Sequence, residues 1–405
     1  MSHNRLGICL YLHVHQPYRV RHYGVFDIGI NHQYFDEEMD RYTVLDKVAH
    51  KSYLPMNETL QEIIKDNPDF KLALSFSGTA LEQFERWRPD VLKSFQELVA
   101  TGNVEILADT YYHSLSFFYS RSEFERQVEQ HRKTIKRLFN QSPQVFRNTE
   151  LSYRNDLGQW AEANGYKGVL AEGWDPLLGW RSPNFAYKPP NTKHVKLLLK
   201  NYKLSDDVAF RFSEQTWPDW PLDADKFARW IHSHHGNGET VNLFMDYESF
   251  GEHQWADSGI FDFMRALPAK LKSKPGTIFW TPSEAMDALE ARDEYDVPDI
   301  LTWADSERDL SAWVGNDIQK IAMEQLYNLE GPVLETGDDQ IIEDWRRLTT
   351  SDHPYYMCTK WFADGDVHAY FSPYDSPYDA HIYFMNALTD LKQRLAKTGV
   401  YSYAT

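Results

Sequence analysis

Carboxylates and histidines recur along this chain just after short apolar runs. Glu150 follows the run that begins at Val145, and Asp246 ends the run that begins at Val241. Two carboxylates that face one cleft are the pair glycosidases use, one as nucleophile and one as proton donor. A lone Asp after a strand more often caps a helix. The glycosidase hypothesis therefore depends on several polar residues meeting in one place.

His13 and His15 end the first apolar run. Side chains two positions apart in a strand point to the same face, so both rings face the same way. Together with Asp109 or His113 they offer the donor types of a metal site. They could equally bind sugar hydroxyls, or be structural histidines held by neighbouring carboxylates. The residues alone leave these three interpretations open.

Other candidate residues also follow apolar runs or stand near their ends, and they are Glu105, Trp174, Glu248, His253 and Trp303. The flat C–H faces of sugars stack on aromatic rings, and 15% of the residues are aromatic. Most aromatic rings in proteins are ordinary core, however. In a β/α barrel, residues that follow the strands meet at the C-terminal mouth. We therefore expect these candidates to converge there.

The apolar runs predict eight buried strands, at residues 6–12, 71–76, 104–107, 145–147, 168–171, 195–199, 241–245 and 277–280. Amphipathic patterns predict helices at residues 54–66, 80–100, 122–139, 156–164, 223–232 and 260–272. Ser122 and Glu125 predict a capping box. Gly102 and Gly165 stand where C-terminal caps belong. This alternation favours a parallel β/α barrel or a distorted relative. No Gly-x-Gly-x-x-Gly motif follows the first strand, which disfavours a dinucleotide-binding sheet.

The alternation stops near Pro282. A helical pattern capped at Asp305 or Ser306 runs to Leu329, and another helix fits residues 381–397. We therefore predict two domains. Residues 1–285 form the catalytic barrel, and residues 286–405 form a C-terminal helical domain that contributes to the active-site cleft.

Composition excludes several classes of partner. The net charge is -18, and such an acidic surface repels nucleic acids and anionic lipids. Two cysteines, Cys9 and Cys358, make no disulfide framework and no zinc–thiolate site. The apolar run at residues 6–12 is too short for a signal peptide, and no run approaches a membrane span. We expect a cytoplasmic protein, and the sequence does not predict its oligomeric state.

Four motifs resemble conserved regions of glycoside hydrolase family 57. The first is His-Val-His-Gln-Pro at residues 13–17, and the second is residues 104–115. The third is residues 146–151, and the fourth is residues 245–253. Residues 305–319 lie where the fifth region belongs. The motifs follow the family's order, and the tyrosine-bearing second and fourth are most similar to its α-amylase group.

The resemblance implies an α/β fold, an incomplete (β/α)7 barrel of distorted TIM type followed by a helical domain. It implies retaining cleavage of α-glucosidic bonds in starch-type or glycogen-type glucans or maltooligosaccharides, with no obligatory metal or cofactor. Glu150 would be the nucleophile and Asp246 the general acid/base, while His13, His15 and Glu105 would contact sugar. Our own additional candidates for substrate binding are Trp174, Glu248, His253 and Trp303. Position 109 is Asp where related amylases often carry Glu.

Three alternatives stay open. The same site would serve a 4-α-glucanotransferase or branching enzyme if an acceptor sugar replaced water. A metal-dependent hydrolase of deacetylase or α-mannosidase type is motivated by His13, His15 and Asp109. A glucan-binding protein without activity is the third.

Overall fold

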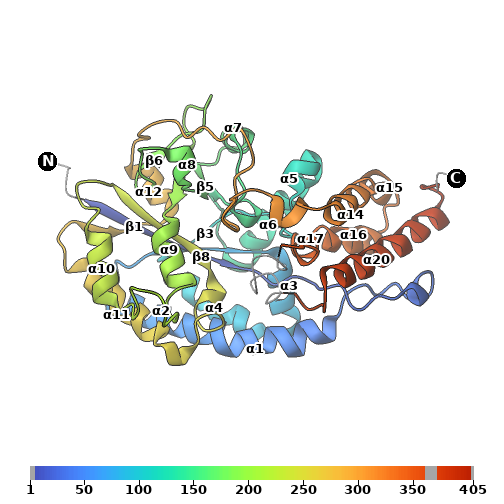
Figure 1. The fold of residues 1–405 in the computed structure, drawn as a ribbon, viewed down its shortest axis with the longest axis horizontal. Helices are drawn as coiled ribbons and strands as arrows, with labels where there is room; N and C mark the ends of the chain where they lie inside the picture. The colour runs from blue at the N-terminus through green and yellow to red at the C-terminus, as the bar shows by residue number, and fades with distance from the viewer. Residues whose placement is uncertain (1–4, 361–371, 403–405) are drawn as a thin grey trace.

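The computed structural model describes residues 5–360 and 372–402. The barrel has seven parallel strands, of which β1, β3, β5 and β8 are labelled in Figure 1. They are β1 (Leu6–Val14), β2 (Leu72–Phe76), β3 (Val104–Ile106), β4 (Val145–Phe146), β5 (Gly168–Glu172), β7 (Lys196–Lys200) and β8 (Thr240–Asp246). One sheet runs β3-β2-β1-β8, and the other runs β4-β5-β7-β6, in which β6 is Ala186–Tyr187.

Two weak joints connect the sheets into an incomplete barrel. An isolated parallel bridge pairs Ala108, just after β3, with Phe146 of β4. Between β7 and β8 there is no ladder, and the backbone N–H of Asn201 donates to the carbonyl oxygen of Asn242 at 2.9 Å. This arrangement confirms the predicted barrel of seven parallel strands.

Each of the eight predicted strands is present. The eighth, β9 (Thr277–Phe279), pairs with the first residues of β1 and lies outside the ring of seven. The sequence did not predict β6 (Ala186–Tyr187), which pairs antiparallel with β7. A strand of two residues leaves no periodic signal.

Helices surround the barrel, and they are α1 (Asp46–Val48), α2 (Leu54–Asp66), α3 (Gly78–Trp87), α4 (Pro89–Ala100), α5 (Ser116–Tyr119), α6 (Arg121–Phe139), α7 (Asn155–Ala163), α8 (Asp175–Leu178), α9 (Tyr202–Ala209), α10 (Ala224–His232), α11 (Ile260–Lys272) and α12 (Pro282–Ala288). The predicted helix at 80–100 is two helices, because Pro89 disfavours helical geometry at Arg88. The predicted capping box was also wrong, since Ser120 caps α6 by accepting from the backbone of Glu123.

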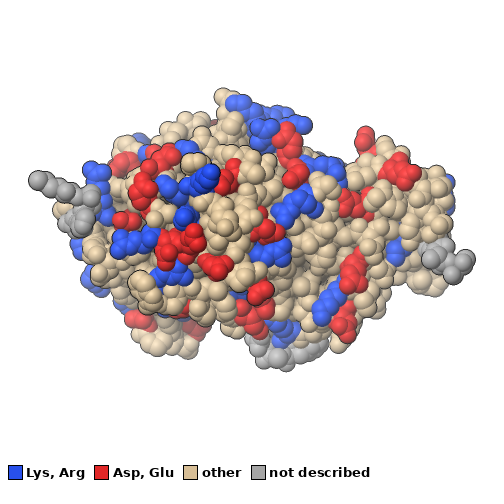
Figure 2. All heavy atoms as spheres, turned by 90° about the horizontal axis from the view of Figure 1, so that it is seen from above, with Lys and Arg blue, Asp and Glu red and all other residues tan. Residues whose placement is uncertain are grey.

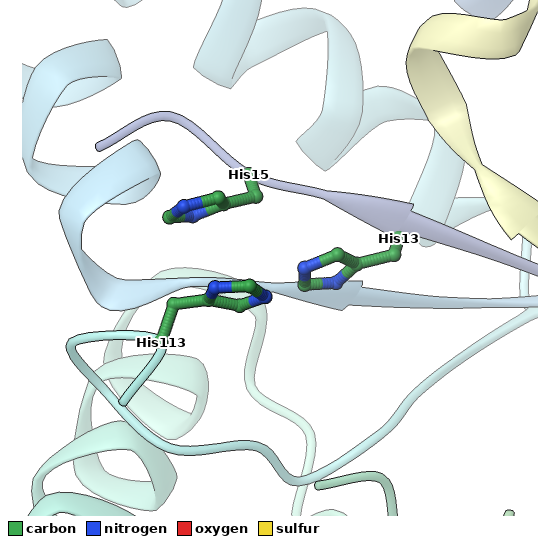
Figure 3. Close-up of side chains that lie close together, drawn as sticks. All are labelled: His13, His15 and His113. Carbon is green, nitrogen blue, oxygen red and sulfur yellow. The ribbon is translucent and has the colours of Figure 1, made fainter. Parts of the chain in front are cut away.

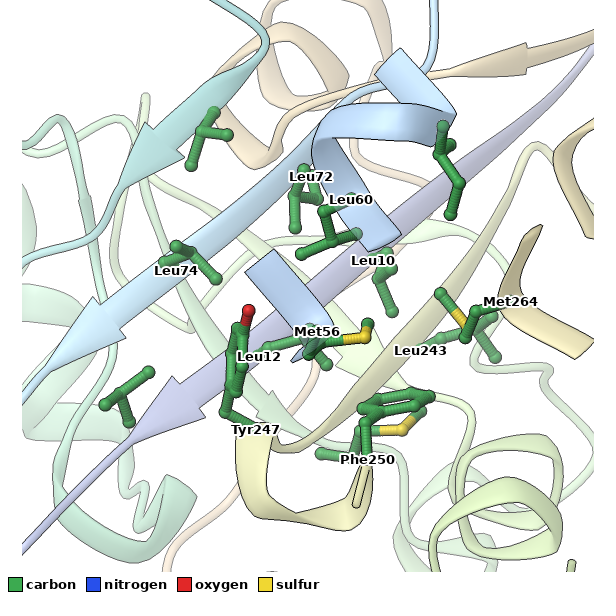
Figure 4. Close-up of a cluster of buried hydrophobic side chains, with 14 of the residues drawn as sticks. Leu10, Leu12, Met56, Leu60, Leu72, Leu74, Leu243, Tyr247, Phe250 and Met264 are labelled. Carbon is green, nitrogen blue, oxygen red and sulfur yellow. The ribbon is translucent and has the colours of Figure 1, made fainter. Parts of the chain in front are cut away.

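Strand side chains that point outward pack against these helices. Figure 4 shows Leu10, Leu12, Leu72, Leu74 and Leu243 of the sheet against Met56 and Leu60 of α2 and Met264 of α11. All are buried. Because alternate residues of β1 enter this cluster, His13 must point to the other face, into the barrel.

The C-terminal part is helical, with α13 (Ser311–Val314), α14 (Asp317–Tyr327), α15 (Glu330–Glu335), α16 (Asp339–Leu348), α17 (Asp352–Tyr356) and α20 (Pro377–Thr398). The predicted helix from Asp305 was wrong in its start, because residues 301–310 form a loop and Asn316 caps α14. The predicted domain boundary at residue 285 falls inside α12, which contacts β1 and β7.

The surface carries both signs of charge. On the face shown in Figure 2, Lys and Arg side chains are interspersed with Asp and Glu. No helix in residues 5–360 or 372–402 combines the length and apolar character that a membrane span requires.

Candidate active site

Polar residues stand at the carboxyl ends of neighbouring barrel strands. Asp246 is the last residue of β8, Lys200 the last of β7 and Glu172 the last of β5. His13 is the next-to-last residue of β1, in register with Asp246. Parallel strands bring their ends to one mouth, so these groups share one edge of the barrel.

Glu150 enters the mouth from a strained turn after β4. Its φ is 59° and that of Leu151 is 52°, in the left-handed region that residues other than glycine rarely adopt. Such a conformation costs on the order of 1–3 kcal/mol per residue and persists where surrounding contacts enforce it. Here the backbone N–H of Trp303 donates to the carbonyl oxygen of Glu150 at 3.4 Å.

Both carboxylate oxygens of Glu150 accept hydrogen bonds. The indole Nε1–H of Trp303 donates to Oε2 at 2.9 Å, and the hydroxyl of Ser351 donates to Oε1 at 3.3 Å. The hydroxyl of Ser351 also lies 3.0 Å from Nδ1 of His113. Three segments that are distant in sequence therefore fix the direction of one carboxylate.

Burial raises the pKa of Glu150 to about 7, although Arg147 and the bond from Trp303 act in the opposite direction. The charges of Asp352 and Asp246 raise this pKa further. The charge of Asp246 therefore acts on Glu150 across the mouth. Burial and the charges of these two carboxylates both favour the protonated form of Glu150.

Burial also raises the pKa of Asp246, while His253, Arg147 and Lys200 lower it. Glu248 lies beside it, and burial together with the charge of Asp246 raises the pKa of Glu248 to about 8. Tyr53 donates its hydroxyl proton to Oε1 of Glu248. The mouth therefore holds a carboxyl group that remains protonated at neutral pH next to Asp246.

Arg147 is the buried cation that these carboxylates share. It is 0% exposed, and its Nη1 lies 3.4 Å from Oδ2 of Asp109 and 3.4 Å from Nε2 of His113. Its charge is the largest influence that lowers the pKa of Glu150, and it also lowers the pKa of Asp246. Arg147 therefore favours the ionised form of both carboxylates.

Three histidines lie against one another at the mouth (Figure 3). The rings of His15 and His113 are stacked with centroids 3.9 Å apart, and those of His13 and His113 with centroids 5.0 Å apart. Burial lowers the pKa of both His13 and His113 well below the ordinary value, so both rings are neutral. Nε2 of His15 donates to Asp352 of α17 at 2.8 Å.

The histidine cluster has the donor types of a zinc site but not its geometry. One nitrogen from each ring lies within 4.8 Å of the others. Lone pairs of imidazole lie in the ring plane, so rings stacked within 18° of parallel do not converge on one ion. Nε2 of His113 also faces the Arg147 cation, and both nitrogens of His15 have partners. The cluster therefore fits hydroxyl recognition better than metal binding.

The mouth brings together seven of the nine predicted site residues, namely Glu150, Asp246, His13, His15, Glu248, His253 and Trp303. Glu105 lies apart, because Oε2 accepts from the backbone N–H of Ser283 at the start of α12. It is level with Ala73 and Tyr11, one side-chain layer before His13. Its contacts are those of a helix-capping carboxylate.

No contact joins Trp174 to Glu150 or Asp246 among the interactions of the described residues. Trp174 precedes α8, and its backbone N–H donates to the hydroxyl of Tyr295 at 3.3 Å. Its half-buried ring packs against the apolar cluster around β5.

Four site residues were not predicted as such. His113 and Asp109 appeared only as possible metal ligands, and Arg147 lay within the third motif without an assigned role. Asp352 has no local signal, because it begins a helix 337 positions after its partner His15. Only the packing of α17 onto the barrel reveals it.

A model of a family described as "Glycosyl hydrolase family 57" matches residues 9–298. A protein of Methanocaldococcus jannaschii described as a "putative alpha-amylase" is 42% identical over 95% of this chain and 85% of that protein.

Solved structures share the fold at low identity. A GH57-type branching enzyme of Pyrococcus horikoshii superposes with a TM-score of 0.71 and 16% identity, over 97% of this chain and 89% of that one. An alpha-amylase of Thermotoga maritima gives a TM-score of 0.62 and 14% identity, over 99% of this chain and 95% of that one.

Proposed function

The chain belongs to glycosyl hydrolase family 57, and from this premise we propose that it hydrolyses α-glucosidic bonds of starch-type or glycogen-type glucans with retention of configuration. Glu150 is the nucleophile and Asp246 the general acid/base. The observation that supports the proposal is a chain of contacts between the strand ends that carry the two groups. Nδ1 of His113 lies 3.8 Å from Oε1 of Glu150, the ring of His113 stacks on that of His13, and His13 is in register with Asp246.

In the first step Asp246 gives its proton to the glycosidic oxygen while Glu150 attacks the anomeric carbon. The bond to the leaving sugar breaks, and a β-glucosyl ester forms on Glu150. In the second step Asp246 takes a proton from water, the water oxygen attacks the anomeric carbon, and the ester bond breaks. The product has the α configuration, and both carboxyl groups return to their starting states.

The two groups differ in ways that suit these roles. Glu150 accepts bonds from Trp303 and Ser351, which aim its carboxylate, and the bond from Trp303 opposes the effect of burial on its pKa. The pKa of Asp246 is raised by burial, which favours a proton donor.

The histidine cluster supports binding of the reacting sugar. His13 is buried, and its Nε2 has no hydrogen-bond partner among the described residues. A buried polar atom without a partner is costly, and a sugar hydroxyl would satisfy it. We also assign Glu248 and His253, which interact electrostatically with Asp246, to substrate binding.

The test is cleavage of maltooligosaccharides and amylose, with product anomers followed by NMR. We expect α products at first, with reducing ends that accumulate steadily. Constant reducing ends with altered chain lengths would show a glucanotransferase or branching enzyme instead. Initial β products would contradict retention, and bound glucan without turnover would contradict the hydrolase proposal. Glu150→Gln serves as the inactive control.

A further inference from the structure

The loop of residues 301–310 carries Trp303 to Glu150, and a group of charged residues holds this loop against the barrel. We call Glu172, Lys200, Asp206 and Arg308 the ionic cluster. Arg308 donates from Nη1 to the carbonyl oxygen of Trp303. The same guanidinium lies 3.7 Å from Glu172 and 3.3 Å from Asp206. Arg308 therefore joins the loop to the cluster.

Rigid elements fix the rest of the cluster. Glu172 and Lys200 are the last residues of β5 and β7 and lie opposite each other in register. Asp206 lies on α9 and accepts from Nζ of Lys200 at 3.0 Å. The cluster contains two acidic and two basic side chains. Two of them, Glu172 and Lys200, are buried. The cluster therefore anchors Arg308 to strand ends that do not depend on the loop.

The loop does not hold its shape through local preference. Asp305 has a φ of 52° and Arg308 a φ of 55°, both in the left-handed region. Residues other than glycine keep such conformations only where contacts enforce them. The backbone N–H of Thr302 donates to the carbonyl oxygen of Arg308 at 2.8 Å, and Nζ of Lys360 lies 3.2 Å from Oδ2 of Asp305. The guanidinium of Arg308 bonds to the carbonyl oxygen of Trp303 and ties this end of the loop to Asp206 of α9.

The indole of Trp303 is held on several sides. Cζ of Arg147 lies 4.9 Å and Nζ of Lys200 lies 5.4 Å from its ring centroid, within the range of cation–π attraction. Its Nε1–H donates to Oε2 of Glu150 at 2.9 Å. Lys200 thus contributes both to the ionic cluster and to the placement of the ring.

We propose that Arg308 is a positioning residue, which acts through the carbonyl of Trp303 to hold the indole N–H on Oε2 of Glu150 and so aims that carboxylate at the reacting sugar. The proposal rests on the proposed function, in which Glu150 is the nucleophile. It also gives Trp303 a positioning role in place of the expected contact with substrate.

The pH profile of kcat/KM shows whether Arg308 positions the carboxylate of Glu150 or only stabilises the fold. The charged and titratable groups around Glu150 are Arg147, His113, Asp246, Asp352 and Tyr355. Substitutions at Trp303 and Arg308 do not alter any of these five groups. Loss of the indole bond removes an influence that lowers the pKa of Glu150. The acidic limb of kcat/KM must then move to higher pH.

The experiment compares Arg308→Gln, Trp303→Phe and the double variant on maltooligosaccharides across the pH range of activity. Each single variant should lower kcat by about 10-fold to 100-fold, the range expected when a hydrogen bond to a charged group is lost. Each should also raise the pH of the acidic limb. The double variant should resemble the more severe single variant, because both act on one bond. Arg308→Lys should restore part of the activity.

Arg181→Gln is the matched control, because Arg181 also binds carbonyl oxygens and a carboxylate, those of Leu178, Glu294 and Asp293. It should leave the acidic limb in place. The proposal would be overturned if the acidic limb of kcat/KM did not move in Arg308→Gln. It would also be overturned if the losses of kcat in the two single variants added up in the double variant. If Arg308→Gln does not fold, an unmoved limb in Arg308→Lys overturns it. Normal activity of Glu150→Gln would instead refute the proposed function itself.

Discussion

The carboxylate of Asp352 accepts a hydrogen bond from Nε2 of His15 at 2.8 Å, although the two residues lie 337 positions apart. His15 follows the first barrel strand and Asp352 begins α17, so this bond joins the helical part to the catalytic mouth. Burial would raise the pKa of Asp352, but the influence of His15 keeps it below the ordinary value. Asp352 is therefore an anion that fixes the histidine cluster.

Asp352→Asn should reduce kcat/KM by about 10-fold to 100-fold, because a neutral amide makes a weaker bond to His15. Thermal stability should change little, since the amide still fits the site. Kinetics on maltooligosaccharides and a melting curve provide the measurements. Asp317→Asn, an exposed carboxylate of the same helical part, is the control. Equal kcat/KM in both variants would argue against a role for Asp352 in the site.

Glu150→Gln should be more stable than the natural chain at pH 8 and no more stable near pH 4.5. Burial raises the pKa of Glu150 from 4.5 to about 7. The protonated carboxyl therefore contributes stability that is complete below the unfolded pKa and is lost as the pH rises through 7. The ionised group then costs on the order of 1–3 kcal/mol, which glutamine avoids.

Melting temperatures at the two pH values measure this effect. Glu58→Gln, at an exposed position on α2, should show no such dependence on pH. A Glu150→Gln variant that is less stable at pH 8 would contradict the assignment of a desolvated carboxylate to this site.

Exhaustive chelation should leave turnover unchanged, because the rings of His13, His15 and His113 are stacked and do not converge on a single point. The measurement is kcat with and without chelator, followed by elemental analysis of the treated protein. Loss of activity that zinc alone restores would favour the metal-dependent hydrolase.

Gly251→Ala should destabilise the fold by roughly 2–4 kcal/mol and reduce activity. Its φ is 106°, and an added Cβ would lie 1.9 Å from the carbonyl oxygen of Lys51. The strain would displace the turn that leads to His253. Gly331→Ala, where a Cβ meets nothing within 4 Å, should be neutral or stabilise by up to about 1 kcal/mol. Denaturant unfolding of both variants compares them directly, and similar losses would contradict this account.

The sequence predicts the barrel well because each strand is a short buried run with polar flanks. Leu6 begins β1 and Phe76 ends β2, as predicted. Asp246 and Glu150 could be located in the same way, since a residue that follows a parallel strand lies at the mouth. Local pattern thus determines which residues reach the mouth.

Local sequence patterns do not predict contacts between segments that are distant in the sequence. The local pattern around Asp305 and Arg308 predicts a helix, but both residues adopt left-handed φ values in a loop. Ion pairs join Arg308 to Glu172 and Asp206, and Asp305 to Lys360. Glu105 belongs to a motif that resembles the family, yet strand register places it one layer before His13. Asp352 depends on how the helices pack onto the barrel. These features require the tertiary structure.

In the proposed mechanism Glu150 forms a covalent bond to the reacting sugar. The most direct test treats the enzyme with 5-fluoro-α-glucosyl fluoride, whose glycosyl–enzyme ester breaks down slowly, and locates the label by mass spectrometry of peptides. We predict a fluoroglucosyl ester on the peptide that contains Glu150, and no label in Glu150→Gln. A label on Asp246, or inhibition by the reagent without any covalent adduct, would contradict the assignment of Glu150 as nucleophile.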